Sequence, residues 1–195
     1  MIILQLISAD VKSLEEEYNL TVDKWMDEIH VCEVCGGIFK KNGTYIRSIL
    51  VDEPSSVSIP FRVQRIKCKL CKKTHALLPS ILFPYRRVPT YTIEDILRKY
   101  AANETIESLA ETIRFAPRTI AKWCQTIQLK MDPLIKWASQ KLASYKTEVH
   151  WLKGVCTRGR ERLLWLFQLL DLLCRLDYPN HKSGVLSLLN VLRPC

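Results

Sequence analysis

Hydrophobic side chains recur at helical spacing in an acidic stretch near the start of the chain. Within residues 10–29 they stand mostly three or four positions apart, at Leu14, Tyr18, Val22, Trp25, Met26 and Ile29. This spacing predicts an amphipathic helix with one apolar face. The apolar opening before it, Met1–Ile7, predicts a strand or a buried arm.

Two strand-like runs follow, Ile46–Val51 and Val57–Ile66, separated by the polar, proline-bearing break Asp52–Ser56. Their β-branched residues, bounded by turn-forming ones, predict a pair of strands that lead out and back. The segment Pro79–Pro89 contains three prolines. They exclude a regular helix, so we expect an extended linker held by its apolar side chains.

From Thr92 onward the pattern becomes helical. Capping residues and prolines mark four starts: Thr92 with Asp95, Asn103, Pro117, and Asp132-Pro133. The helices that they predict are Ile93–Ala102, Glu104–Thr112, Pro117–Leu129 and Pro133–Tyr145.

Beyond residue 146 a leucine-rich helix is predicted over Arg160–Asp177, and a short one over Val185–Leu192. The leucines cover more than one face of the first of these helices. Such a helix is buried on several sides or shared with a second copy. The C-terminal region is therefore a candidate surface for a homodimer or another protein partner.

The second and third predicted helices fit a helix-turn-helix. Leu109, Ala110, Ile113, Ile120 and Trp123 face inward in this arrangement. The outward residues of the third helix are of types that donate to base edges or phosphates: Arg118, Thr119, Lys122 and Gln125. Arg114 stands in the turn where glycine is often found, which leaves the turn geometry open. The alternative is an ordinary helical hairpin within a bundle.

Two Cys-x-x-Cys pairs, Cys32 with Cys35 and Cys68 with Cys71, have the spacing of a Zn(Cys)4 site. A two-residue spacer lets a tight turn aim both sulfurs at one ion, and the second pair completes the tetrahedron. Four thiolates leave no open coordination position, so we expect one structural Zn²⁺ in a zinc ribbon with an elaborated hairpin. The alternatives are four unrelated thiols, two strained disulfides, or His75 in place of one cysteine.

The net charge of +9 is unevenly distributed along the chain. Residues 1–30 hold seven acidic residues against two lysines, a net of −5, so the remainder carries +14. Between Glu53 and Glu94 there are eight basic residues and no acidic one. Such a block around a metal site indicates a polyanionic partner, most simply nucleic acid. The candidate phosphate contacts are Arg86, Arg87, Lys69, Lys72 and Lys73. The alternative is a merely solvated basic face.

Eight cysteines in a chain without a secretory signal indicate a reducing compartment and metal binding. The apolar run Leu163–Leu173 is interrupted by Gln168 and Asp171 and is too short to span a bilayer. We therefore expect a cytoplasmic protein without membrane contacts. The remaining cysteines lack ligand spacing and are expected to be core or incidental thiols: Cys124, Cys156, Cys174 and Cys195.

With both motifs located, the chain resembles an uncharacterised family of bacterial proteins, found with mobile elements, that join a zinc ribbon to a transposase-like helix-turn-helix. The likeness covers about residues 30–130. It is carried by Cys32-x-x-Cys35-Gly36, Arg65-Ile66-Lys67-Cys68-x-x-Cys71, Thr74–Pro79 and Pro84-Tyr85-Arg86-Arg87. The resemblance implies DNA binding tied to transposition or its regulation, in a nucleoid-associated bacterial protein.

No catalytic constellation emerges from the sequence. A two-metal transposase or nuclease needs several converging carboxylates, usually in a strand-rich domain. Beyond the helix-turn-helix, the acidic residues lie on predicted helices or their ends: Asp132, Glu148, Glu161, Asp171 and Asp177. A phosphate-binding glycine-rich loop is missing too, and Tyr145 or Tyr178 near Arg158–Arg162 is the nearest match to a recombinase nucleophile. We expect a protein without enzymatic activity of its own.

The sequence thus predicts an α+β fold with a small N-terminal zinc ribbon, a mainly α helix-turn-helix domain and a helical C-terminal region. The expected divisions are an acidic arm (1–29), the ribbon (30–80), a Pro/Arg linker (81–91), the helix-turn-helix domain (92–146) and the leucine-rich region (147–195). The leading functional hypothesis is sequence-specific binding of double-stranded DNA, as a transposase-related accessory factor or transcriptional regulator. The alternatives are a protein–protein adaptor with an incidental basic surface, and a transposase fragment that lacks its catalytic part.

Overall fold

The chain has an α+β fold that divides into two compact units, residues 1–91 with 181–195 and residues 92–180. The computed structural model describes residues 2–4, 6, 11–50, 58–83, 86–145 and 159–177. The short helix predicted over Val185–Leu192 lies outside the described residues, as do Cys156 and Cys195. No helix in the described ranges is long and apolar enough to cross a membrane.

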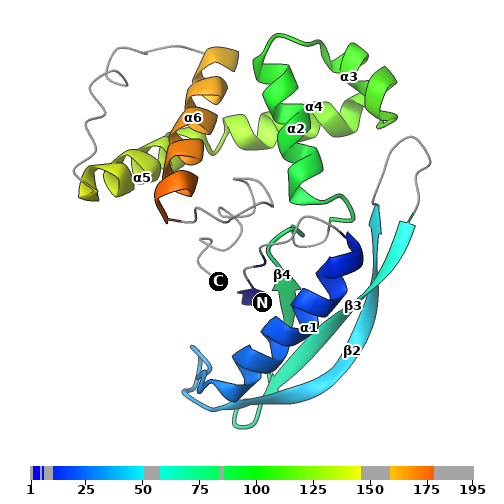
Figure 1. Cartoon of the computed structure of the whole chain (residues 1–195), viewed down its shortest axis with the longest axis vertical. Helices are drawn as coiled ribbons and strands as arrows, with labels where there is room; N and C mark the ends of the chain where they lie inside the picture. The colour runs from blue at the N-terminus through cyan, green and yellow to red at the C-terminus, as the bar shows by residue number, and fades with distance from the viewer. Residues whose placement is uncertain are drawn as a thin grey trace. The chain divides into compact units, whose positions relative to one another are not determined.

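The first unit is built on a four-stranded sheet in the order β1-β4-β3-β2 (Figure 1). Its strands are β1 (Ile2–Leu4), β2 (Phe39–Leu50), β3 (Ser58–Cys68) and β4 (Thr74–Pro79). β1 pairs with β4 in parallel, and the other two pairings are antiparallel. The apolar opening of the chain therefore forms a strand. β4 is a strand that the sequence pattern did not predict.

β2 and β3 form a long curved hairpin, whose register runs from Phe39 opposite Cys68 to Leu50 opposite Ser58 (Figure 1). Both strands extend further toward the cysteines than predicted. Most of the added part of β2 is polar and exposed, which an edge strand tolerates because only one of its sides is paired, whereas Phe39 packs against the core. A register shift between Lys41 and Thr44 contains Gly43, whose φ of +72° suits glycine.

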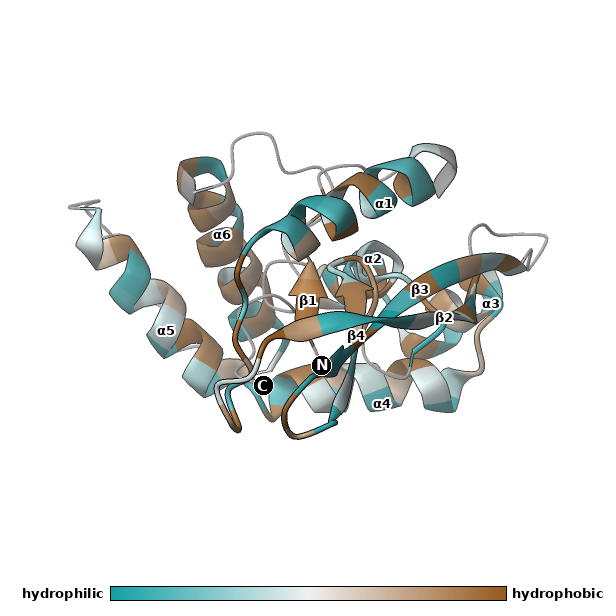
Figure 2. Cartoon of the chain, turned by 90° about the horizontal axis from the view of Figure 1, so that it is seen from below, coloured by the Kyte–Doolittle hydropathy of each residue, from teal (hydrophilic) through white to brown (hydrophobic). Residues whose placement is uncertain are grey.

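Helix α1 (Val11–Asp27) packs its apolar face on this sheet through Leu14, Tyr18 and Val22, each at most 4% exposed. Burying side chains of this size contributes about 1.5–3 kcal/mol each. Figure 2 shows the resulting alternation of brown and teal along α1.

The hydroxyl of Tyr18 joins two strands that separate at this point. It accepts a hydrogen bond from the Gln64 N–H of β3 at 2.9 Å and donates one to the Leu77 carbonyl of β4 at 2.7 Å. Direct β3–β4 pairing is confined to Arg65–Lys67 opposite Thr74–Ala76. Tyr18 thus occupies the position of the next ladder bond, and β3 and β4 diverge beyond it.

The second unit is helical: α2 (Thr90–Ala101), α3 (Ile106–Ile113), α4 (Pro117–Gln128), α5 (Met131–Ser144) and α6 (Arg160–Asp177). The bounds of α4 and α6 agree with the sequence pattern to within one residue. Three predicted caps were wrong. α2 begins two residues before Thr92, and α5 begins at Met131, ahead of Asp132-Pro133. The cap of α3 is Thr105, whose hydroxyl accepts from the Ser108 N–H at 3.1 Å, whereas Asn103 lies in the preceding turn with a φ of +75°.

Helix α6 is buried along much of its length, which is one of the two arrangements that its leucine content predicted. Figure 2 shows hydrophobic residues, in brown, along much of this helix. Its residues at most 3% exposed are Leu163, Leu166, Phe167, Leu169, Leu170 and Leu173. Arg98 of α2 lies over the Phe167 ring at 4.4 Å and forms ion pairs with Glu94 at 2.8 Å and Asp171 at 2.6 Å. This half-buried arginine is therefore neutralised by two carboxylates, which raise its pKa although burial opposes them.

Candidate metal centre and nucleic-acid interface

The two Cys-x-x-Cys pairs fold into turns with the same hydrogen bonds. In the first knuckle, the Gly36 N–H donates to the Cys32 carbonyl at 2.7 Å, and the Cys32 N–H donates to the Gly37 carbonyl at 2.8 Å. The second knuckle repeats both bonds from Lys72 to Cys68 at 3.2 Å and from Cys68 to Lys73 at 2.9 Å. The residue after each second cysteine is left-handed, with φ of +68° at Gly36 and +64° at Lys72.

These matched turns bring four sulfurs together. The Sγ atoms of Cys32, Cys35, Cys68 and Cys71 lie within 4.8 Å of one another, with 3.8 Å from Cys32 to Cys71 and 3.4 Å from Cys35 to Cys68. Zn–S bonds of about 2.3 Å at tetrahedral angles require S···S edges of about 3.8 Å. The four cysteines can therefore hold one metal ion. His75, the alternative ligand, is not a member of this cluster.

The backbone prepares the sulfurs for a cation. A hydrogen bond from Gly37 is the largest influence on Cys35, and it lowers the pKa of that thiol. The hydrogen bond from Lys73 acts in the same direction on Cys71. There it is outweighed by burial and by the other three cysteines, which together raise the pKa of Cys71 to about 11. Crowded thiolates repel one another unless a positive ion lies between them.

Gly37 sets how closely the knuckles approach. A Cβ at this position would lie 2.6 Å from the Leu70 Cβ and 2.8 Å from the Cys68 Sγ. Both distances are shorter than real Cβ contacts, so only glycine fits. The Lys69 N–H also donates to the Ile38 carbonyl at 2.9 Å, which ties the second knuckle to the start of β2.

The other cysteines with a described environment are Cys124 in α4 and Cys174 in α6. Burial raises the pKa of both thiols, to about 11 for Cys124. They lie on separate helices and are not members of the four-sulfur cluster. Cys124 is a buried core thiol and Cys174 is half-buried, and neither belongs to that site.

The predicted phosphate contacts of the first unit lie in two places. Lys69, Lys72 and Lys73 are exposed in the turn between β3 and β4, where the Lys72 Nζ donates to the Lys69 carbonyl at 2.7 Å. Arg86 and Arg87 lie apart from them, after the buried Ile81 and Leu82 of the proline-rich segment. No regular helix occurs in the described part of that segment, as its prolines predicted.

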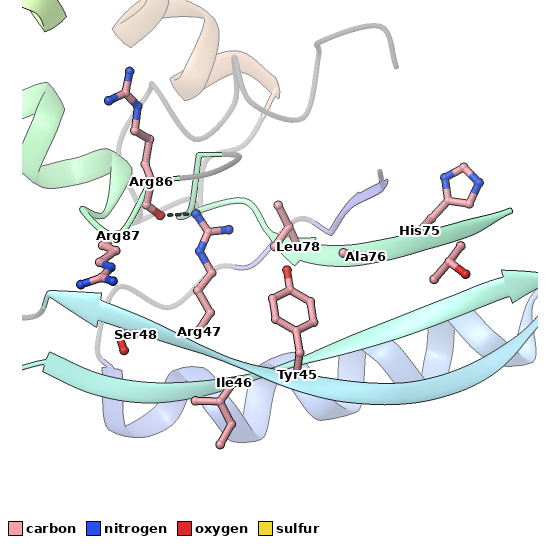
Figure 3. Close-up of a pocket in the computed structure, with 10 residues that line it drawn as sticks. Tyr45, Ile46, Arg47, Ser48, His75, Ala76, Leu78, Arg86 and Arg87 are labelled. Atoms are coloured by element: carbon pink, nitrogen blue, oxygen red, sulfur yellow. Dashed lines mark hydrogen bonds between the residues drawn. The ribbon is translucent and has the colours of Figure 1, made fainter.

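A cavity of about 630 Å³ opens beside Arg87 (Figure 3). It is lined by ten residues of β2, β4 and the proline-rich segment: Tyr45, Ile46, Arg47, Ser48, Thr74, His75, Ala76, Leu78, Arg86 and Arg87. From β2, Tyr45 and Arg47 point toward β4 and the proline-rich segment, whereas Ile46 points away (Figure 3). None of the lining residues is acidic.

The helix pair α3–α4 carries the other predicted DNA contacts. Leu109, Ala110, Ile113, Ile120 and Trp123 are buried, as expected for its inward side. Arg114 adopts a left-handed φ of +54° and ends α3, so it fills the conformation that glycine often supplies in such turns. On α4, Arg118, Lys122 and Gln125 are exposed, whereas Thr119 is half-buried.

Sequence reasoning missed Gly37 as a packing residue and Arg47 as a member of a cavity. For Arg47 a signal existed: it alternates with Tyr45 and Ile49, so it lies on the apolar face of its strand. A charged residue on that face is unusual enough to mark a site. For Gly37 the sequence carries no equivalent signal, because the clash involves a residue 33 positions away.

A family model described as a domain of unknown function (DUF6431) matches residues 32–123. The matched stretch begins at the first cysteine of the cluster and ends at Trp123 in α4. No curated protein and no solved structure matches the chain.

Proposed function

We propose that this protein is a zinc-stabilised, sequence-specific double-stranded DNA-binding protein, acting as a mobile-element accessory factor or a transcriptional regulator. The observation that carries the proposal is the exposed side of α4. Arg118, Lys122 and Gln125 project from it into solvent, and no acidic residue occurs between Glu111 and Asp132. Arginine, lysine and glutamine are the side chains that most often reach base edges in the major groove.

The arrangement of α3 and α4 supports this use of the helix. Three residues, Arg114–Ala116, join the two helices, and Pro117 begins the second. A helix pair with a turn this short is the usual means of presenting the N-terminal part of the second helix to DNA. Arg118 and Lys122 lie in the first half of α4, where such contacts are made.

Zinc is the ion that suits the four-cysteine cluster best. Thiolates are soft ligands that favour zinc or iron, and an all-cysteine tetrahedron is typical of structural zinc. The ion would be held by Cys32, Cys35, Cys68 and Cys71, and it would close the open end of the β2–β3 hairpin. In this proposal Lys69, Lys72, Lys73, Arg86 and Arg87 contribute phosphate contacts, which add affinity without reading sequence.

The proposal is tested by fluorescence anisotropy of the metal-loaded protein with duplexes from the DNA flanking its own gene, at low and near-physiological salt. We expect one fragment to bind more tightly than the others at both salt concentrations. The double substitution Arg118→Ala, Lys122→Ala should abolish that preference. The matched control removes two exposed charges from other helices of the same unit, Lys136→Ala and Arg175→Ala. Equal losses in both variants, or no preferred fragment, would refute sequence reading by α4.

A second function, protein–protein adaptor, is favoured by one observation. Val34 and Leu70 occupy the same position in the two knuckles and are 60% and 65% exposed, beside Val31 and Ile38 at 58% and 47%. Exposed apolar residues gathered around a metal cluster suit a protein partner. Salt separates the two functions, because phosphate contacts weaken steeply as salt rises and apolar contacts do not.

A further inference from the structure

Arg47 is a half-buried cation for which the described residues provide no carboxylate. Its Nη2 donates to the Phe83 carbonyl at 2.6 Å and to the Arg86 carbonyl. Burial lowers the pKa of this guanidinium, and the neighbouring Tyr45 opposes that shift. Arg98, the comparable half-buried arginine of the second unit, has Glu94 and Asp171 as partners. Charges removed from water are normally paired, so Arg47 lacks a counter-ion that Arg98 has.

The surroundings of Arg47 suit an anion. Its guanidinium borders the 630 Å³ cavity, whose lining includes Arg86 and Arg87 and no acidic residue. Both carbonyl contacts use Nη2, and a side-chain hydrogen bond also joins Arg47 to Tyr45. A guanidinium has five N–H donors, so donors remain for a ligand. In Figure 3 the Arg86 side chain extends away from Arg47, and Arg87 is the other arginine that lines the cavity.

The size and the other walls restrict the anion further. A cavity in the range of about 300–1,000 Å³ holds a small organic molecule, which is more than a bare ion needs. Tyr45 offers an aromatic ring and a hydroxyl, Ser48 and Thr74 offer hydroxyls, and Ala76 and Leu78 offer apolar surface. Arginine forks match the geometry of phosphate oxygens, and an aromatic ring beside them can pack on a base or sugar.

We propose that the cavity between β2, β4 and the proline-rich segment binds a phosphate-bearing ligand of nucleotide size, with Arg47 and Arg87 on the phosphate. The ligand is a free nucleotide or a nucleotide of a DNA strand, which present the same chemistry. The inference does not depend on base reading by α4, because every lining residue belongs to the first unit.

The test is isothermal titration of the full-length, metal-loaded chain with a nucleoside 5′-monophosphate, the corresponding nucleoside, and inorganic phosphate. We expect the monophosphate to bind, inorganic phosphate to bind more weakly, and the nucleoside not to bind. Arg87→Gln should weaken monophosphate binding by about tenfold or more, because hydrogen bonds to charged groups are the strong ones. Arg87 is exposed, and its backbone carbonyl still accepts from the Leu50 N–H after substitution, so this variant should fold.

Two further variants complete the test. Arg47→Lys keeps the charge but loses the planar fork, and it should also weaken binding. The matched control is Arg62→Gln, which removes an exposed charge from the opposite face of the same hairpin, where Arg62 pairs with Ile46. Equal weakening by Arg87→Gln and Arg62→Gln would mean a general charge effect and would overturn the proposal. The proposal would also be overturned if neither the monophosphate nor inorganic phosphate bound.

Competition by short duplexes identifies the source of the phosphate. Displacement of the monophosphate by a duplex with 5′-phosphate ends, but not by one with 5′-hydroxyl ends, assigns the site to a strand terminus. Displacement by both assigns it to the DNA backbone, and displacement by neither assigns it to a free nucleotide. If the protein binds the monophosphate but shows no α4-dependent preference among duplexes, the pocket proposal stands and the proposal of sequence-specific DNA binding fails.

Discussion

Substituting Gly37 by alanine tests the geometry of the metal centre with a single methyl group. The added Cβ would meet the Leu70 Cβ at 2.6 Å and the Cys68 Sγ at 2.8 Å. Non-bonded carbon atoms are at their optimum about 3.5–4.0 Å apart, so the knuckles must separate by about 1 Å. The Leu70 Cβ is fixed to its backbone, and its nitrogen also lies at 3.3 Å, so a side-chain rotation cannot relieve the contact.

The magnitude follows from what a metal site tolerates. Ligand distances in such sites hold to within about 0.2 Å, well below the required displacement. Overpacking of this kind costs about 1–3 kcal/mol. Without metal the two knuckles can separate, which relieves this strain. The overpacking free energy therefore lowers the affinity for the metal rather than the stability of the metal-free protein. Because 1.4 kcal/mol corresponds to a factor of ten, we expect Gly37→Ala to lower metal affinity by about 5- to 150-fold.

The assay is competition between the protein and a chromogenic chelator of known affinity, with thermal denaturation as a second readout. Gly43→Ala is the matched control, because a Cβ there meets nothing within 4 Å although its φ of +72° imposes strain. It should lower stability by about 1 kcal/mol and leave metal affinity unchanged. If Gly37→Ala and Gly43→Ala bind metal equally well, the close approach of the knuckles does not govern the site and the reasoning fails.

Three further predictions concern other parts of the molecule. Tyr18→Phe should lower the free energy of unfolding, measured by chemical denaturation, by about 1–3 kcal/mol, because the Gln64 N–H and the Leu77 carbonyl lose their hydrogen-bond partner. A change near zero would mean that β3 and β4 move together and that these two groups bond to each other. Thr105→Ala should cost about 1 kcal/mol by the same measurement, and Asn103 cannot replace this cap. Acidification should release the metal, since thiolate ligands take up protons as pH falls; an indicator assay showing affinity independent of pH would contradict thiolate ligation.

The four-cysteine cluster could be predicted from the sequence because its geometry is largely local. A Cys-x-x-Cys spacer fixes the turn that aims two sulfurs, whatever the rest of the chain does. The same holds for α4, where Pro117 marks the first turn and the apolar spacing runs to Gln128. In the neighbouring helices α2, α3 and α5 the predicted N-terminal caps were wrong, because several polar residues lie near each helix start and tertiary packing selects which of them becomes the cap.

The features that escaped prediction depend on long-range contacts. β4 is six residues long and has no alternating pattern, so only its pairing with β1 and β3 identifies it. The polar first half of β2 forms a strand because Phe39 pairs with Cys68, which the knuckles bring into register. The cavity beside Arg47 likewise forms only where the fold brings β2, β4 and the proline-rich segment together.

The parallel pairing of β1 with β4 has a consequence for the order in which this chain is assembled on the ribosome. Ile2 pairs with Leu77, so β1 is synthesised before β4 and cannot be placed until β4 has emerged. Helix α1 cannot pack in its final position either, because the sheet that covers Leu14 and Tyr18 is not yet complete. During this interval the apolar face of α1 is open to solvent, and it is the natural target for a chaperone or for aggregation. A mutation that slows the β2–β3 hairpin would lengthen that exposure, even where it leaves the finished fold unchanged.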